Sequence, residues 1–303
     1  MNIVKNFKKL ILIPVVILVA AIVVCAVCGG LNLGVDFTGG SMVIVDIGTE
    51  FDSEKVLSIV EKVEGTGTGV SVTTSENTQA LIKIQSSGDS ATDEKVITNM
   101  VEEIKAGGFE NAKRGTTDSV GASSSAELIK NALLSVGIAC VLMLIYITIR
   151  FEFWMAVGSV AALVHDVLIM ICMMGIFRVS VDSNFIAACL TIVGYSINNT
   201  VIIFDKVRDN LYSATEIDRA QIVQDSVKST LGRTINTTIT TLIMIVSLYI
   251  FGVHSVKVFT LPIIVGLLAG TFSSLVIAPS IWALCSAKGK KNTKAVRKVK
   301  VIK

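Results

Sequence analysis

Charged residues are scarce in this chain of 303 residues, where Asp, Glu, Lys and Arg make up 17% and hydrophobic residues 52%. The mean hydropathy of +0.71 lies far above that of soluble domains. The sequence has no glycine-rich phosphate loop, no zinc-ligand cluster and no nucleophile elbow. The scarcity of charge and the high hydropathy exclude an ordinary soluble domain. The missing motifs give no support to an enzymatic role. We therefore expect no catalytic residues, no metal site and no resident cofactor.

Cysteine is absent from the polar stretch between residues 31 and 127, because all six cysteines lie in or at the ends of apolar runs. That stretch therefore has no disulfide framework. Cys25 and Cys28 have the C-x-x-C spacing of a redox motif, but no βαβ pattern flanks them. Two buried thiols are the favoured interpretation.

Long apolar runs are the dominant feature of the chain, each close to the roughly 20 residues that a helix needs to cross a bilayer. Lipid offers the backbone no hydrogen-bond partners, so each run must be helical. The first run has the basic start of a signal peptide, but its length and the lack of an A-x-A-like site favour an uncleaved anchor. The expected fold class is a polytopic α-helical membrane protein with six transmembrane helices, at residues 10–30, 128–150, 155–177, 183–204, 235–253 and 258–285.

Lysine and arginine are distributed unevenly between the two sets of loops. One set of short loops carries only Arg178 and Lys257. By the positive-inside rule, the basic segments, and with them both termini, are expected in the cytoplasm. The basic segments are residues 1–9, the loop at Arg150, residues 205–234 and the tail 286–303.

Two of these basic segments have further patterns. Residues 205–234 carry apolar side chains at roughly helical spacing, which predicts an amphipathic helix lying along the cytoplasmic surface. The tail 286–303 is interpreted as a solvated segment that fixes topology, with contact to anionic lipid or ribosomal RNA as the alternative. The apolar residues of the amphipathic pattern are Ile217, Ile222, Val223 and Val227.

Residues 31–127 form a polar insert that we expect outside the cytoplasm, as a small α+β domain. Its acidic residues exceed its basic ones, which fits a solvated surface and argues against a specific nucleic-acid partner. The predicted order βαββαβ is that of a ferredoxin-like domain. The predicted elements are strand Ser41–Gly48, helix Ser53–Glu64, strands Gly69–Thr74 and Ala80–Gln85, helix Thr92–Ala106 and strand Phe109–Asp118.

Asp166 is a carboxylate near the middle of the third run, about 16 Å along the helix from its start. A charge there costs on the order of 2.5–3.5 kcal/mol, so the side chain should face protein or water. Two interpretations remain open: a residue on an ion path, or a protonated acid that is hydrogen-bonded to a neighbouring helix.

Polar residues form stripes on the fourth and fifth runs, which pass through the membrane in opposite directions. Asn198 and Asn199 are expected roughly 10 Å deep, level with Thr240, so the two stripes are predicted to face each other. Arg233 either extends toward the headgroups or turns inward to the asparagines. Gly266 and Gly270 of the sixth run predict close helix packing. The candidate ion-coupling residues are Asp166, Asn198, Asn199, Asp205, Arg233, Asn236, Thr237, Thr240 and Thr241.

Six segments, taken in order, resemble SecF, the smaller subunit of the bacterial SecD–SecF protein-export complex. The resemblance runs from the first span to the sixth. Its junction motif, between the first span and the insert, contains Gly34, Asp36, Phe37, Gly39 and Gly40. The six segments are residues 34–40 (GVDFTGG), 162–166 (ALVHD), 194–200 (GYSINNT), 201–210 (VIIFDKVRDN), 233–241 with Arg-Thr-Ile-Asn-Thr and Thr240-Thr241, and 266–274 (GLLAGTFSS).

The resemblance implies half of a transporter of the resistance-nodulation-division superfamily, in the bacterial cytoplasmic membrane. It implies SecD, the Sec translocon (SecY, SecE and SecG), translocating preproteins and membrane lipid as partners. The ion gradient, carried by H+ or Na+, would replace ATP in drawing polypeptide outward. Residues 34–40 and 121–125 are expected to be flexible joints of the insert.

Two positions depart from the family pattern. Family members commonly have Asp, linked to proton passage, where this chain has Asn199, and an amide does not titrate. Residues 118–128 also lack the family's usual proline. Two other functions therefore stay open. One is half of a small-molecule or lipid exporter of the same superfamily, which the small insert disfavours; the other is a structural subunit that stabilises SecD and conducts nothing.

Overall fold

The computed structural model of the chain divides into two compact units, which are considered separately. The helical unit contains Met1–Leu31, Ser135–Val179 and Asn184–Lys303, and the insert domain contains Asn32–Leu134 and Ser180–Ser183. Cys28 and the basic tail from residue 289 onward lie outside the described residues. The described residues are 6, 12–27, 31–63, 70–75, 78–84, 90–120, 122–214, 218–252 and 254–288.

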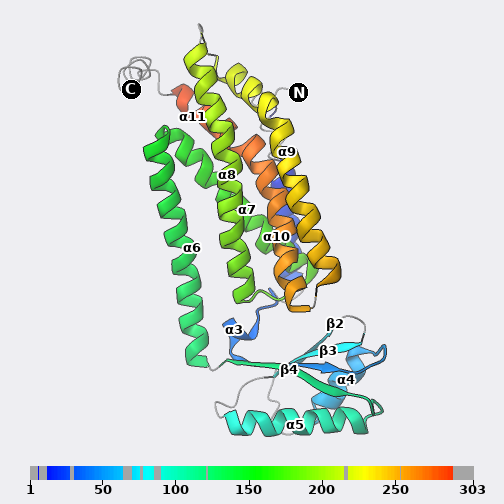
Figure 1. Cartoon of the computed structure of the whole chain (residues 1–303). Coiled ribbons are helices and arrows are strands. Elements are labelled where there is room, and N and C mark those ends of the chain that lie inside the picture. Colours follow the sequence, from blue (N-terminus) through cyan, green and yellow to red (C-terminus); the bar gives the residue numbers. More distant parts are fainter. Residues whose placement is uncertain are drawn as a thin grey trace. The chain divides into compact units, whose positions relative to one another are not determined.

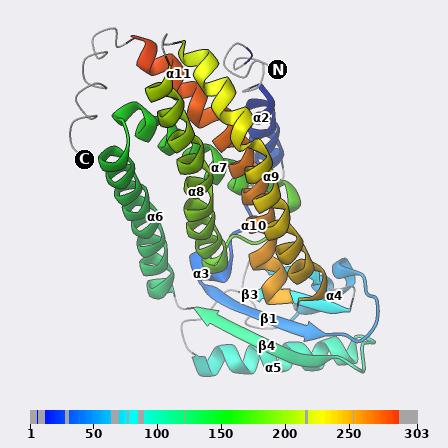
Figure 2. The same ribbon diagram turned by 45° about the horizontal axis from the view of Figure 1, so that its top comes forward.

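The insert domain contains a four-stranded sheet in the order β2-β3-β1-β4, in which all neighbouring strands are antiparallel. The strands and longer helices follow one another as β-α-β-β-α-β, and Figure 2 shows β1 and β4 side by side. β4 begins later than expected because residues 109–112 form a turn, closed by a hydrogen bond from Ala112 N to Phe109 O (2.9 Å). The elements are β1 (Gly40–Asp46), α4 (Ser53–Val60), β2 (Ser71–Ser75), β3 (Gln79–Ile84), α5 (Ser90–Ala106) and β4 (Lys113–Val120).

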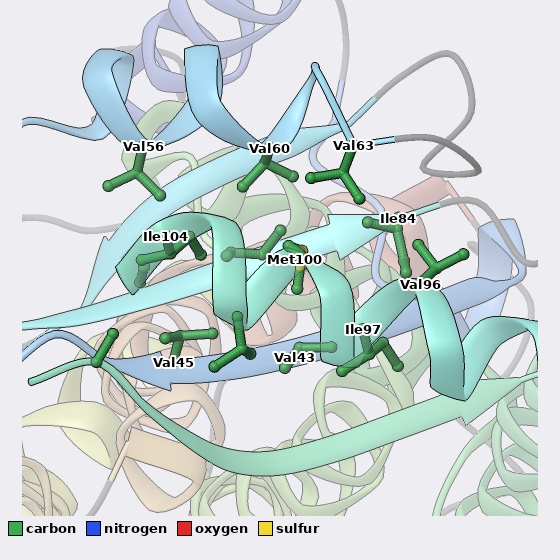
Figure 3. Close-up of a cluster of buried hydrophobic side chains, with 14 of the residues drawn as sticks. Val43, Val45, Val56, Val60, Val63, Ile84, Val96, Ile97, Met100 and Ile104 are labelled. Carbon is green, nitrogen blue, oxygen red and sulfur yellow. The ribbon is translucent and has the colours of Figure 1, made fainter. Parts of the chain in front are cut away.

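A single hydrophobic core holds the two helices against one face of this sheet (Figure 3). Alternate residues of β1, Val43 and Val45, are fully buried, as the period of two in a strand requires. The helices contribute residues four apart, because such positions share one helical face. This packing explains how the domain folds without cysteine. The helical contributors drawn in Figure 3 are Val56, Val60 and Val63 from α4 and its end, and Val96, Ile97, Met100 and Ile104 from α5.

Among the described residues, five helices are long and apolar enough to cross a membrane. A shorter apolar helix, α2 (Leu12–Val27), covers part of the predicted first span. Figure 1 shows α8 and α9 joined at one end and running back in opposite directions. The long elements are α6 (Ala122–Arg150), α7 (Phe153–Phe177), α8 (Ser183–Ser213), α9 (Arg219–Phe251), and α10 (His254–Phe272) continued by η1 (Ser273–Ile277) and α11 (Ala278–Lys288).

The predicted amphipathic surface helix at residues 205–234 is wrong. Helix α8 continues to Ser213 and α9 already begins at Arg219, so most of this segment extends the two long helices. The apolar stripe of α9 packs against α8 rather than on a membrane surface, because Val223 and Val227 are buried in one cluster with Phe204. Ile217 lies outside the described residues.

Candidate ion-coupling site

Asp166 on α7 is fully buried, and both of its carboxylate oxygens have hydrogen-bond partners. Oδ2 accepts from Ser196 Oγ of α8 (2.6 Å) and from Ser273 Oγ (2.9 Å), while Oδ1 lies 2.9 Å from His165 Nδ1. Three helical segments thus supply polar groups to one carboxylate. Such bonds offset the cost of burying it.

Ser273 reaches Asp166 from η1, a π-helical turn between α10 and α11. The π-helix is rare and typically appears as a single turn inside an α-helix, frequently at functional sites. Here the turn is buried, and its first residue donates to the carboxylate. The π-helical turn therefore brings the Ser273 hydroxyl to Asp166.

Glycines on α10 allow the helix to approach the residues around Asp166. A Cβ added at Gly270 would lie 3.2 Å from Ser196 Cβ and 3.5 Å from Asp166 Oδ2. A Cβ added at Gly266 would lie only 2.5 Å from Ile192 Cγ1. The predicted small-residue face thus packs next to the carboxylate, a position that its spacing alone did not indicate.

Gly266→Ala should destabilise the purified protein by about 1–3 kcal/mol, because the added methyl group overpacks the interface with α8. The matched control is Gly194→Ala on α8, where an added Cβ would meet nothing within 4 Å. Thermal unfolding in detergent measures the difference. Equal midpoints for the two variants would contradict the close packing.

A second polar layer lies between α8, α9 and α10. Tyr195 Oη lies 3.4 Å from Thr238 Oγ1, which lies 2.9 Å from Thr271 Oγ1. Asn199 and Thr234 are also buried, at 1% and 0% exposure. Among the described residues, Asn199 Nδ2 and Thr234 Oγ1 have no hydrogen-bond partner. The inner face of α9 is thus formed by threonines spaced four apart.

The prediction that the two polar stripes face each other with Asn198 and Thr240 on the inside is wrong. Asn198 is exposed on the surface of this chain, and Thr241 is half-buried. The polarity of α9 does not reveal its orientation, because buried threonines such as Thr234 and exposed ones such as Thr237 lie on adjoining parts of the same side of this helix. Asp205 lies apart from the polar centre, half-buried, in ion pairs with Arg208 (2.7 Å) and Arg150 (3.5 Å). The exposed candidates are Asn198, Arg233, Asn236, Thr237 and Thr240.

Several residues of the site were missed by the sequence analysis. Ser196 belongs to the segment GYSINNT, in which the asparagines are the more polar side chains and therefore the stronger candidates. Ser273, Thr238 and Thr271 gave no signal beyond being small polar residues in apolar runs. A buried carboxylate must find donors on neighbouring helices, but the partner helix and turn depend on packing.

The junction motif forms a second candidate site, within the insert domain. Gly34 N donates to Val181 O (2.7 Å) and Val181 N donates to Asn32 O (2.8 Å). The carboxylate of Asp36, in the short helix α3 (Val35–Thr38), accepts from the backbone N–H of Ser183 (2.8 Å), the first residue of α8. We call Asn32–Asp36, Lys83 and Ser180–Ser183 the junction latch.

Lys83 of β3 closes the latch. Its Nζ lies within hydrogen-bond distance of Asn32 Oδ1 (2.9 Å), Ser180 Oγ (3.1 Å) and Leu33 O (3.2 Å), so each of the three ammonium protons has an acceptor. Burial lowers the pKa of Lys83, and the charge of Asp182 partly opposes this shift. The latch therefore contains a partly desolvated cation that belongs to the sheet.

The described parts of the expected joints at both ends of the insert have regular structure, and their flexibility stays a prediction. Phe37 lies in α3, half-buried, and Gly39 and Gly40 have positive φ (71° and 127°) where α3 passes into β1, a backbone that favours glycine. At the other joint, Ser125 is buried and its hydroxyl lies 3.4 Å from Val35 O. Both segments thus contain hydrogen bonds.

Long apolar helices, an α+β insert and a hydrogen-bonded carboxylate inside the bundle define a polytopic membrane protein. Residues 100–288 match the C-terminal family of SecD/SecF protein export membrane proteins, and residues 29–47 match the SecD/SecF GG motif. The chain belongs to the SecD/SecF family and is a protein-translocase subunit of the SecF kind.

Curated relatives show the same family membership. The chain is 37% identical to protein translocase subunit SecF of Sebaldella termitidis over 84% of this chain and 82% of that protein. It is 33% identical to SecF of Helicobacter pylori strain J99 over 94% of this chain and 89% of that protein. Against protein translocase subunit SecDF of Bacillus subtilis the identity is 36%, over 83% of this chain and 34% of that protein.

Solved structures of SecDF have the same fold. The Thermus thermophilus SecDF, described as a translocon-associated membrane protein, matches with a TM-score of 0.81 and 27% identity, over 95% of this chain and 39% of that one. SecDF in a super-membrane-facing form matches with a TM-score of 0.66 and 25% identity, over 97% and 40%. This chain therefore spans about two fifths of the length of those SecDF chains.

Proposed function

We propose that this chain, with a SecD partner, uses the ion gradient of H+ or Na+ across the bacterial cytoplasmic membrane to move its insert domain during preprotein export. The observation that carries this is the buried Asp166, which is held by hydroxyl groups from α8 and η1. A carboxylate at such a position is expensive and marks ion paths. Binding or release of an ion there changes the charge of the carboxylate to which Ser196 and Ser273 donate. This change favours a different packing of the helices.

The junction latch supports a mechanical link between this charge and the insert domain. Ser180–Ser183 belongs to the insert domain, and Ser183 is also the first residue of α8. The same helix carries Ser196, which contacts Asp166. A displacement of α8 that follows a change at Asp166 is thereby transmitted to a segment that Asp36 and Lys83 hold.

The exposed polar face of α9 supports a membrane partner. Arg233, Asn236 and Thr237 are exposed on a helix that is otherwise apolar enough to span the bilayer. Polar groups facing lipid are costly, so a second protein would cover them. SecD fits this role because some relatives, such as B. subtilis SecDF, carry both names in one chain. Through SecD the chain would assist the Sec translocon, SecY, SecE and SecG, within membrane lipid.

The proposal includes a membrane topology for the chain. Six spans with both termini in the cytoplasm place the insert outside it, where an emerging preprotein is accessible. The strand order β2-β3-β1-β4 with two helices on one face supports a ferredoxin-like domain.

Depletion of this chain should cause precursors of secreted proteins to accumulate, most strongly where the ion gradient is large enough to drive export. Pulse-labelling followed by signal-peptide cleavage measures the effect, and re-expression of the intact chain provides the control. Normal precursor processing under every condition would contradict the proposal. Drug or lipid-export phenotypes without a secretion defect would favour the small-molecule exporter.

A further inference from the structure

We propose that a groove between α2, α7 and α10 binds one acyl chain of a membrane phospholipid. The groove has a volume of about 280 Å³ and lies within the helical unit. Pro14 and Ile17 of α2 line it together with Ile169 of α7 and Leu268 of α10. Among the described residues that line it, only His165 is polar. The groove is therefore built to contact hydrocarbon.

The size and the lining of the groove favour hydrocarbon over water as its occupant. An apolar cavity of about 150 Å³ lined by similar side chains stays dry and binds benzene. An unfilled groove deprives its lining atoms of dispersion contacts, so the filled groove is the more stable state. Two of the helices that form it, α7 and the continuous segment from α10 to α11, are long and apolar enough to cross a membrane. Lipid is thus the medium around the opening.

The surface around the groove suits lipid better than a protein partner. Leu268 at the groove is 54% exposed, and the neighbouring α2 presents exposed apolar side chains such as Val16 and Val19. The exposed face of α9 is different, because it carries Arg233 and Asn236, which a protein would cover. A flexible acyl chain therefore fits the groove, whereas the partner subunit fits the polar face of α9.

The sequence before α2 favours an anionic headgroup on the bound lipid. Lys8 and Lys9 precede Pro14 by six and five residues, and Lys5 precedes them. Acidic residues do not occur in the sequence before Asp36. Lysines beside a membrane attract anionic lipids, and the proposed topology places these three at the cytoplasmic surface. We therefore expect the ligand to be an anionic phospholipid such as phosphatidylglycerol.

The role of the bound chain rests on the proposed function. The His165 side chain lines the groove, and its Nδ1 lies 2.9 Å from Asp166 Oδ1. Phe272 lines the groove as well, with its ring centroid 6.1 Å from that of His165. An acyl chain packed against these two rings keeps water away from this side of Asp166. The lipid thus seals the coupling carboxylate against a leak of ions.

Ala269→Phe tests the site, because Ala269 lines the groove at 8% exposure and the added ring takes up its space. The complex of this chain with SecD is purified from vesicles of phosphatidylethanolamine and phosphatidylglycerol and weighed by native mass spectrometry. We expect the variant to retain one phospholipid fewer than the intact complex. Ile17→Phe, which fills the groove from α2, should have the same effect and replaces the first variant if that one does not fold.

Ile243→Phe is the matched control for both variants. Ile243 lies on α9, is 62% exposed and does not line the groove. Its variant adds the same ring to the surface of the bundle and should retain the full number of phospholipids. Equal retention in Ala269→Phe, Ile17→Phe and Ile243→Phe would overturn the inference.

Phosphatidylglycerol with a photoreactive diazirine in its acyl chain provides the second readout. Lipid of the surrounding bilayer reaches the exposed Ile243, but only a chain inside the groove reaches Ile169, which is 7% exposed. We expect both residues to be labelled in the intact complex and only Ile243 in Ala269→Phe. Label at Ile243 without label at Ile169 in the intact complex would overturn the inference.

The remaining outcomes separate the parts of the account. Equal labelling of Ile169 by a phosphatidylethanolamine probe would reject the preference for an anionic headgroup. Normal export in Asp166→Asn would reject the proposed function and the sealing role with it. The lipid site itself is decided by retention and labelling alone, because neither measurement depends on export.

Discussion

Asp166→Asn is expected to reduce gradient-driven export to the level of cells depleted of this chain, while the complex with SecD still assembles. The amide has nearly the volume of the carboxylate and still accepts from Ser196 and Ser273, so the helices keep their packing. It has no charge to neutralise and does not bind and release a proton. Export in a depletion strain, together with copurification of SecD, measures the two effects separately.

Asp225→Asn is the matched control for this change. Asp225 lies exposed on α9 and accepts a hydrogen bond from Gln221 Nε2 (2.9 Å), an arrangement that is worth little to stability. Its variant should export normally. If Asp166→Asn and Arg233→Ala both assembled with SecD and exported at the normal rate, the chain would be a structural subunit instead.

Gly34→Ala is expected to impair export as severely as the loss of Asp166, although it lies in the insert domain. An added Cβ would lie 2.8 Å from Asp182 Cβ and 3.2 Å from Val181 O, so the latch must separate to admit it. The backbone of Gly34 itself (φ −69°) suits any residue, which makes the effect purely steric. Overpacking of this kind costs about 1–3 kcal/mol, enough to open a contact made of a few hydrogen bonds.

A disulfide between cysteines introduced at Leu33 and Val181, which pair in a parallel bridge, reports on latch closure. It should form readily in the otherwise intact chain and poorly in Gly34→Ala. Asp36→Ala removes the carboxylate that accepts a hydrogen bond from Ser183 N. Like Gly34→Ala, it should impair export. Gly137→Ala on α6, where an added Cβ meets nothing within 4 Å, is the control. Equal crosslinking in Gly34→Ala and the control would contradict the latch.

The insert domain was largely predictable because its strands alternate and its helices repeat with regular periods. Val43 and Val45 illustrate the strand period of two, and Val56 and Val60 lie one helical turn apart. Asp166 was also located by a simple argument, since a carboxylate in an apolar run must face protein or water. These features depend on local patterns, which a sequence displays directly.

The partners of the polar residues could not be predicted, because they depend on how helices rotate and pack. Thr234 and Thr237 look alike in sequence, yet the first is buried and the second exposed. Lys83 lies in an ordinary alternating strand, and its contact with Ser180 joins segments almost a hundred residues apart. The continuation of α8 to Ser213 was missed because an apolar stripe fits a helix partner as well as a membrane surface.

The most direct measurement of the central claim is single-molecule energy transfer in vesicles that contain the chain and SecD. One fluorophore is placed on the insert domain at Lys95 and the other on the helical unit at Asp225, both exposed positions. The proposed coupling predicts that imposing an ion gradient shifts the distance distribution, and that Asp166→Asn abolishes the shift. An unchanged shift in Asp166→Asn, or no shift in the intact chain while gradient-driven export proceeds, would contradict it.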